Sequence, residues 1–467
     1  MSEESEFVDI NWGNTILSAR WNHIWHNKLF SNATFTYSKF GFQFFNTSES
    51  EREDSMRDYT VLTQYNFDSR IEDYALKMDF DFLPNPKHHI KFGGGILERV
   101  FQPILQFQEI ELEDFDFNFG EGFIEQDSIL ETPKYFATEL NFYIEDEITL
   151  SPRLRAQVGF HNAVFTAANS AWISFQPRLS LDYQVHPKGR LYTSFGRMAQ
   201  FLHVLSPAGI SMPFDLWVPS TQKVKPQSAN QLIIGTEWEL PADFTFGTET
   251  YYKKLSNLIT YRAGVESILN GNGANFDWEN EVTFGEGWNY GIETSLKRTA
   301  GKASGFINYT WSKADRHFDG INNEERFPFR YHREHSVKIG LSQEFGPKFN
   351  IFASWTYGSG QFTTPRVIEV YGDGTNIDIF QLDLEGTGGT INNVRLPAKH
   401  QLDLNFNWHW AKTRVDHYLT FGINNVYNNR TVLFPVRYVD LEDSSNSETA
   451  NIKGLPILPS LRYSVKF

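Results

Sequence analysis

Histidine pairs are the residues of this chain whose types and spacing first suggest a metal site. The pairs are His23 and His26, His88 and His89, and His332 and His335. Within each pair the residues are one or three positions apart, and on an extended strand such positions point to opposite faces. A pair on opposite faces cannot hold one ion, so we expect ordinary polar histidines and no metal site made by the protein.

Closely spaced acids suggest a second kind of chemistry. Glu145 and Glu147 would share one face of a strand and could formally act as general acid and base. No nucleophile with a base and an orienting group is discernible, however, and no G-x-S-x-G motif occurs. The glycine runs at 93–95 and 386–389 lack the following helix that a phosphate cradle needs, and we interpret them as a bend and a loop tip. We therefore expect no catalytic residues, no cofactor and no enzyme.

Composition excludes further classes of protein. The chain of 467 residues has no cysteine, which removes disulfides, thiolate metal sites and cysteine nucleophiles. Its net charge of -15 repels nucleic acid. Aromatic residues make up 16% of the chain, which excludes disorder because they can bury ample apolar area. No window approaches the roughly eighteen consecutive apolar residues of a transmembrane helix.

The dominant pattern along the chain is an alternation of apolar and polar residues, as expected for strands. In the clearest segment, 401–410, leucine, phenylalanine and tryptophan alternate with polar residues. Such segments run for roughly ten to eighteen residues, longer than the strands of most globular sheets. Their length and polar faces match the strands of a membrane barrel. The alternative is a soluble β protein that binds carbohydrate, in which the apolar faces would pack against one another.

Short turns alternate with long segments. The short turns lie at 26–28, 84–87, 151–153, 186–189, 241–243, 299–302, 346–348 and 411–413. The connections between them lie at 47–66, 109–132, 201–228, 262–287, 317–333, 362–398 and 440–456, with one short exception at 167–170. Seven of the eight short turns contain Lys or Arg, whereas 109–131 holds nine acids and no base. One rim of short turns and one of long loops predicts an all-β, transmembrane antiparallel barrel with short periplasmic turns and long extracellular loops.

The number of strands is odd. Eight short turns join sixteen strands, and the segment 456–467 adds a seventeenth. Single-chain bacterial barrels have even strand numbers and both termini on the periplasmic side, so an odd count leaves an unpaired edge facing lipid. The first six residues also lack the basic start and apolar core of a signal peptide. We therefore expect the chain to be the C-terminal part of a larger barrel.

Short motifs in a fixed order carry a family resemblance. They are Phe142–Glu147, Gln176–Ser180, Val224–Ser228, Gly235–Glu237, Asn257–Ile259, Asn289–Glu293, Asn308–Ser312, Tyr357–Gly360, Asn424–Asn428 and Leu458–Leu461. Together they resemble the barrel of a TonB-dependent outer-membrane receptor. The segments Trp12–Thr15, Arg20–His23 and His88–Gly94 are similar to Bacteroidetes-type members.

The resemblance implies a barrel of about 22 strands whose lumen is filled by an N-terminal plug. Residues 1–467 would then form the C-terminal part of the barrel domain, with about 17 of those strands and without the plug. Phe467 resembles the terminal aromatic residue by which barrel-assembly machinery recognises its clients.

The resemblance also implies a function in the outer membrane of a Gram-negative bacterium: active uptake of a scarce nutrient such as a ferric siderophore, cobalamin or an oligosaccharide. The implied partners are outer-membrane lipid and lipopolysaccharide, and the energy-coupling TonB complex, engaged through the missing N-terminal part. A SusD-like surface lipoprotein is a further candidate. The sequence does not choose the substrate. The alternative function is a passive or structural outer-membrane barrel, that is, an incomplete gene product without transport activity.

Two clusters near the predicted outer mouth are candidates for ligand contact. Asp215 with Trp217, and Arg330 with His332, each combine charge with an aromatic platform. The competing interpretation is that these are structural loop residues. The acidic segment 109–131 has two interpretations as well: capture of a cationic ligand or a surface lipoprotein, or an acidic loop bridged to lipopolysaccharide by divalent cations.

Overall fold

The structure is a computed structural model of the whole chain. It describes residues 4–54, 57–113, 123–131, 134–167, 169–205, 216–263, 278–370, 376–378, 390–412, 415–440 and 447–466. Among these residues, no helix is long and apolar enough to cross a membrane. Two 3-10 turns, η1 (Pro241–Asp243) and η4 (Asn322–Glu324), interrupt an otherwise all-β fold.

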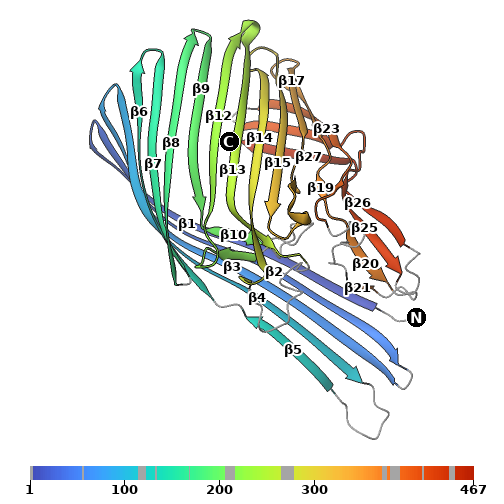
Figure 1. Cartoon of the computed structure of the whole chain (residues 1–467). Coiled ribbons are helices and arrows are strands. Elements are labelled where there is room, and N and C mark those ends of the chain that lie inside the picture. Colours follow the sequence, from blue (N-terminus) through green and yellow to red (C-terminus); the bar gives the residue numbers. More distant parts are fainter. Residues whose placement is uncertain are drawn as a thin grey trace.

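A 19-stranded antiparallel sheet dominates the molecule (Figure 1). Its long strands are β1 (Glu4–His26), β2 (Leu29–Asp54), β3 (Arg57–Asn85), β4 (His88–Glu113), β6 (Tyr135–Ser151), β7 (Leu154–Ala167), β8 (Ser170–His186), β9 (Gly189–Gln200), β12 (Gln227–Leu240), β13 (Phe244–Tyr261), β14 (Val282–Arg298), β15 (Ala303–Phe318), β17 (His335–Glu344), β18 (Phe349–Gly358), β23 (Lys399–Lys412), β24 (Val415–Asn424) and β27 (Leu458–Lys466). Each long strand pairs with the next one along the chain.

Two short strands complete the large sheet. β5 (Phe123–Glu131) pairs with the far end of β4 and continues the position of β6. β16 (Phe327–Pro328) pairs with the end of β15 and continues the position of β17. Of the 19 strands, two therefore extend existing positions, and the seventeen positions predicted from the turns are confirmed.

The remaining strands form small sheets within the long connections. One is the hairpin of β10 (Leu202–Leu205) and β11 (Leu216–Pro219). A second pairs β19 (Phe362–Thr363) with β22 (Val394–Arg395). The third contains β20 (Arg366–Val370), β21 (Asn376–Asp378), β25 (Val432–Asp440) and β26 (Ser447–Lys453).

The eight predicted short turns all join adjacent strands at one rim of the sheet, and those between β8 and β9 and between β12 and β13 are uppermost in Figure 1. The predicted strand lengths are wrong at the start of the chain. β1 to β4 contain 23, 26, 29 and 26 residues, and β2 and β3 stay paired through most of 47–66, which the sequence predicted to be a loop. These strands are longer than a membrane crossing requires, and their backbone hydrogen bonds stay paired along the extra length. Their ends therefore project from the outer rim (Figure 1).

The predicted bend at Gly93–Gly95 is also wrong. These glycines lie inside a regular ladder, where β4 pairs with β3 and β6 without a register shift. A side chain at Gly93 would meet the backbone of Met78 and the ring of Tyr143. The glycines therefore make room for neighbours on a continuous strand.

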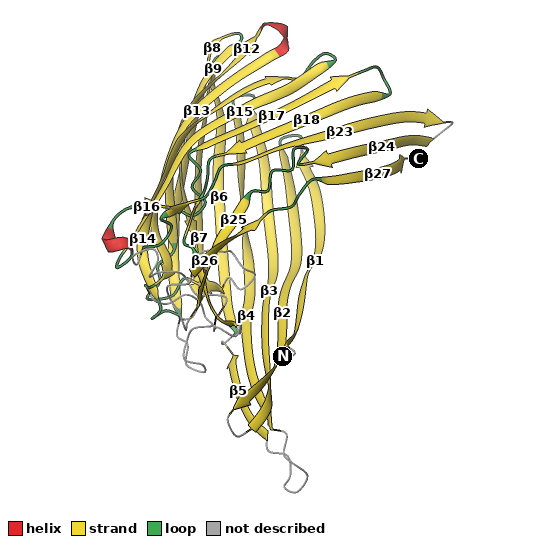
Figure 2. Ribbon diagram, turned by 90° about the vertical axis from the view of Figure 1, so that its right-hand side faces the viewer, coloured by secondary structure: helices red, strands yellow, loops and turns green. Residues whose placement is uncertain are grey.

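The sheet curves around an interior, with β1 and β27 at its two edges (Figure 2). Among the described residues, β1 pairs only with β2, and β27 pairs only with β24, so the sheet is not closed.

The two faces of the sheet differ in polarity. Large apolar side chains on one face are exposed, for example Ile173 at 75% and Ile234 at 53%. A surface of this kind is unfavourable in water but matches the hydrocarbon of a bilayer. Alternate residues point to the other face, which carries charged pairs such as Arg99–Asp73 and Arg190–Asp182 and the larger buried clusters. The first face is therefore the lipid face and the second lines the lumen.

Candidate ligand-binding mouth and lumen wall

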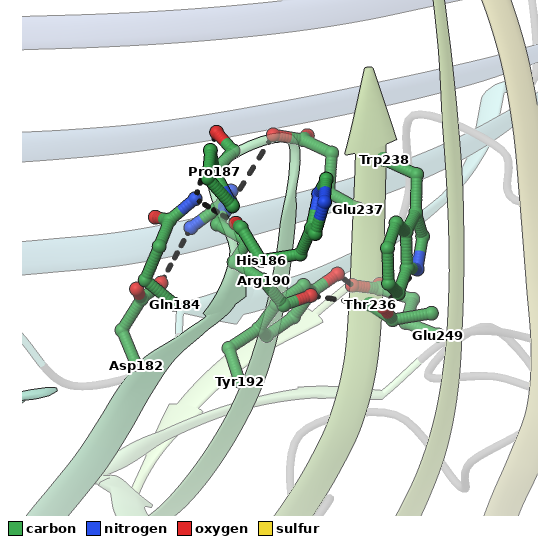
Figure 3. A network of polar contacts seen from close by, with 10 residues as sticks. All are labelled: Asp182, Gln184, His186, Pro187, Arg190, Tyr192, Thr236, Glu237, Trp238 and Glu249. Atoms are coloured by element: carbon green, nitrogen blue, oxygen red, sulfur yellow. Dashed lines mark hydrogen bonds and ion pairs between the residues drawn. The ribbon is translucent and has the colours of Figure 1, made fainter. Parts of the chain in front are cut away.

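The lumen wall near the short turns is lined by a network of charged residues (Figure 3). Arg190 on β9 binds Asp182 of β8 at 2.7 Å and Glu237 of β12 at 3.2 Å. Glu237 is directly opposite Arg190, and Asp182 lies two residues from Gln184, the other residue opposite Arg190, so all three side chains point to the same face. The network joins three strands through charge-assisted hydrogen bonds and gives the lumen a polar lining.

Tyrosine hydroxyls bonded to carboxylates continue this lining. Tyr143 donates to Asp79 at 2.6 Å, and Tyr192 donates to Glu249 at 2.8 Å. The ring of Tyr192 lies where a side chain at position 235 would otherwise be, since that residue is glycine. The tyrosines thus lie against the wall and cross-link strands that are not adjacent.

A cavity of about 290 Å³ lies in the same wall. Its polar lining includes Lys77, Tyr143, Glu145, His161 and Arg178. Lys77 is paired with Asp79 at 2.9 Å, whereas the buried Nδ1 of His161 has no hydrogen-bond partner among the described residues. The volume is at the small end of ligand pockets, so the cavity can hold waters or a small polar group rather than a large nutrient.

The four residues predicted to contact ligand have different environments. Asp215 lies outside the described residues. Trp217 is on β11 and is 36% exposed, while its neighbours Leu216 and Val218 are buried. Trp217 is therefore an exposed ring on a firmly packed strand, which is the arrangement of an aromatic platform.

Arg330 and His332 lie in the segment that joins β16 to β17. The Arg330 guanidinium stacks on the ring of Tyr331, 4.8 Å from its centroid. His332 is only 6% exposed, and its Nδ1 accepts a hydrogen bond from the backbone N–H of Ala314 at 3.0 Å. Burial lowers the pKa of His332. Its ring thus holds the segment to β15.

Sequence reasoning missed a polar trio close to Trp217, of which two members, His203 and Ser220, are buried. His203 on β10 is fully buried; its Nδ1 lies 2.9 Å from the amide nitrogen of Gln227, and its Nε2 lies 3.0 Å from the Ser220 hydroxyl. The amide can donate only to an unprotonated Nδ1, so Nε2 carries the proton and donates to Ser220. Burial lowers the pKa of His203 to about 4. The partners are 17 and 24 residues away, so no local sequence pattern could have revealed them.

Within the described ranges, no group of three or more His, Cys, Asp or Glu side chains could hold a metal ion. Phe467, the predicted assembly signal, and residues 114–122 of the acidic segment lie outside those ranges.

Comparison with known proteins gives a consistent result. Residues 4–428 match the protein family described as TonB dependent receptor-like, beta-barrel. No curated protein matches the sequence.

Solved structures share the fold. BauA, the ferric preacinetobactin receptor from Acinetobacter baumannii, is similar with a TM-score of 0.60 and 12% identity, over 98% of this chain and 63% of BauA. The FrpB iron transporter from Neisseria meningitidis has a TM-score of 0.59 and 12% identity, over 97% of this chain and 72% of FrpB. The chain thus spans less than two thirds of the length of BauA.

Proposed function

Since the chain belongs to the TonB-dependent receptor family, as a β-barrel of the outer membrane of a Gram-negative bacterium, we propose that it forms the wall of a receptor for active uptake of a scarce nutrient. The family consists of transport receptors rather than enzymes, and its members work with TonB. For this chain, the nutrient classes proposed are ferric siderophores, cobalamin and oligosaccharides. Coupling to TonB is proposed to act through an N-terminal part of the gene product.

The observation that carries the proposal is the division of the sheet into two faces. On most of the seventeen strand positions, exposed apolar side chains such as Ile173 and Ile234 face one side, whereas the charged, hydrogen-bonded groups around Arg190 and Tyr192 face the other. A polar lumen inside a lipid-facing wall suits passage of a hydrophilic cargo.

Ferric complexes are the first substrates to test. Two of the structures similar to this chain are named as a ferric preacinetobactin receptor and an iron transporter. Iron would be cargo here, held by its own chelator.

We propose that Trp217 and Arg330 contact the ligand at the outer mouth. Trp217 supplies an exposed ring on a packed strand, and Arg330 supplies a cation beside the ring of Tyr331. Asp215 and His332 remain proposed contributors, His332 through its hold on the segment that carries Arg330. Lipopolysaccharide around the lipid face and a SusD-like lipoprotein at the outer rim are the proposed neighbours.

The proposal is tested by uptake in cells. The native strain, a strain lacking the gene and a strain lacking the energy-coupling protein are supplied with a panel of radioactive ferric siderophores in iron-poor medium. We expect at least one complex to enter only the native strain. Equal uptake of every complex by all three strains would contradict iron transport. Entry that needs the gene but not the coupling protein would instead support the passive barrel.

A further inference from the structure

The connection between β9 and β12 folds inward. These two strands pair directly, from Gln200 with Gln227 to Gly189 with Trp238, so the wall is continuous without the connection between them. Nothing in this pairing requires the connection to enter the lumen. Its described parts, residues 202–205 and 216–226, are here called the strap. Strand β10 of the strap contacts β13, and β11 contacts β4.

Those two contacts place the strap across the lumen. Between β4 and β13 the sheet contains β6, β7, β8, β9 and β12. Six steps of about 4.8 Å each correspond to roughly 29 Å along the curved wall. A segment can touch both strands only by crossing the concave side, and Figure 1 shows β10 running crosswise to the long strands β12 and β13.

Apolar packing connects the strap to both sides of the wall. The strap contributes the side chains of Leu205, Leu216, Val218 and Val224, each no more than 2% exposed. They belong to one buried cluster with Phe42 and Phe67 of β2 and β3, Ile259 and Tyr261 of β13, Val282 of β14, and Trp278. This cluster is a continuous apolar contact from one side of the lumen to the other.

Hydrogen bonds fix the strap at its end. The backbone N–H of Ser220 donates to the carbonyl of Phe201 at 2.8 Å, and the indole of Trp172 donates to the carbonyl of Thr221 at 3.1 Å. Within the trio, His203 hydrogen-bonds to both Ser220 and Gln227, so the buried side chains of His203 and Ser220 have partners. Buried groups with satisfied hydrogen bonds hold one arrangement, since any other would leave them unpaired.

We propose that the strap is a constriction across the outer half of the lumen, and that it limits the size of solutes that enter from outside. The inference does not depend on which nutrient the protein carries, and it applies equally to a passive barrel. Cargo larger than the gap beside the strap can pass only when the strap is displaced.

The absence of cysteine makes this testable with an introduced thiol. Ser194→Cys places a small thiol on the lumen face of β9, between the strap and the short turn at 187–188. Intact cells that carry the full gene product, and cells that carry it without any segment N-terminal to residue 1, are treated with a small membrane-impermeant maleimide and with a polyethylene-glycol maleimide, so that blockage by a plug is told apart from blockage by the strap. Asn323→Cys, on the exposed outer turn η4, reports the amount of protein in the membrane.

Each reporter is combined with a strap variant. Val218→Asp puts a carboxylate into the buried cluster, and Gln222→Asp puts the same charge on an exposed strap residue. We expect Val218→Asp to raise labelling at position 194 about tenfold or more and to admit the larger reagent, because a buried unpaired charge opposes packing. Gln222→Asp should leave labelling unchanged.

A milder variant keeps the test decisive if Val218→Asp does not assemble. Val218→Ala removes two methyl groups from the cluster and should raise labelling by a smaller factor. If neither variant that assembles changes labelling at position 194, while position 323 labels normally, the strap does not limit entry and the inference is overturned. Rapid labelling at position 194 by both reagents with the native strap would overturn it as well.

Discussion

Acid should loosen the strap, because its packing depends on a neutral histidine. Burial alone lowers the pKa of His203 from its ordinary value near 6.5 to about 4. The released strap takes up a proton more readily than the packed one, so the histidine stabilises packing fully above pH 6.5. That contribution is lost as the pH falls from 6.5 towards 4.

The size of the effect follows from the two pKa values. Because the released strap binds a proton more readily, lowering the pH from 7.5 to 5 reduces the free energy of opening of the strap by about 2 kcal/mol. This corresponds to roughly a 30-fold change in the opening equilibrium. Hydrogen–deuterium exchange measures this opening. The amides of Ser220 and Thr221 are suitable reporters, since each donates a backbone hydrogen bond in the packed strap. After correction for intrinsic exchange, their protection should fall about 30-fold at pH 5.

His203→Gln is the matched control, because glutamine is polar but does not titrate. The variant should show weaker protection at neutral pH and no loss between pH 7.5 and pH 5. The same acid loss in His203→Gln and in the native protein would refute the reasoning. The backbone amides of β12, which spans the wall, should keep their protection from exchange at both pH values.

Three further outcomes follow from the two faces and the strap. Ile234→Lys, on the lipid face, should make the free energy of folding into bilayers less favourable by about 2 to 4 kcal/mol, and the lumen-facing Ile233→Lys should cost far less. Equal losses of the two variants in vesicle folding assays would contradict the assigned faces. Phe67→Ala, at a 1% exposed site, should destabilise the strap cluster by about 3 to 5 kcal/mol in denaturant unfolding, and a loss below about 1 kcal/mol would show that the cluster is not packed as described. Trp217→Ala should weaken ligand binding to cells about tenfold, while Phe345→Ala, at the opposite rim, should not change it. Equal affinities of the native protein and both variants would show that Trp217 does not contact the ligand.

The alternation of residues predicted most of the sheet. A strand that faces lipid on one side and water on the other must alternate, so segments such as 401–410 indicate both the strand and its faces. The short turns were equally readable, since proline, glycine and asparagine mark where a strand must reverse. The long strands β2 and β3 were not, because their outer ends leave the membrane and the pattern of a lipid face ends there.

The strap shows where sequence reasoning ended. Trp217 could be selected as an aromatic near the mouth, but nothing local distinguishes it from the buried Leu216 and Val218. His203 gains its partners only when β9 and β12 pair and the connection between them folds inward. Such contacts depend on the curvature of the whole wall, which no short window of sequence contains.

The central claim is that these strands separate lipid from a polar lumen in the outer membrane. The most direct test is a scan of single cysteines along β12, from 231 to 236, in native outer membranes. Positions 232, 234 and 236 should be accessible to a lipid-confined quencher, and 231, 233 and 235 only to water-soluble reagents. Accessibility that lacks this alternation, or that is aqueous at every position, would contradict the account.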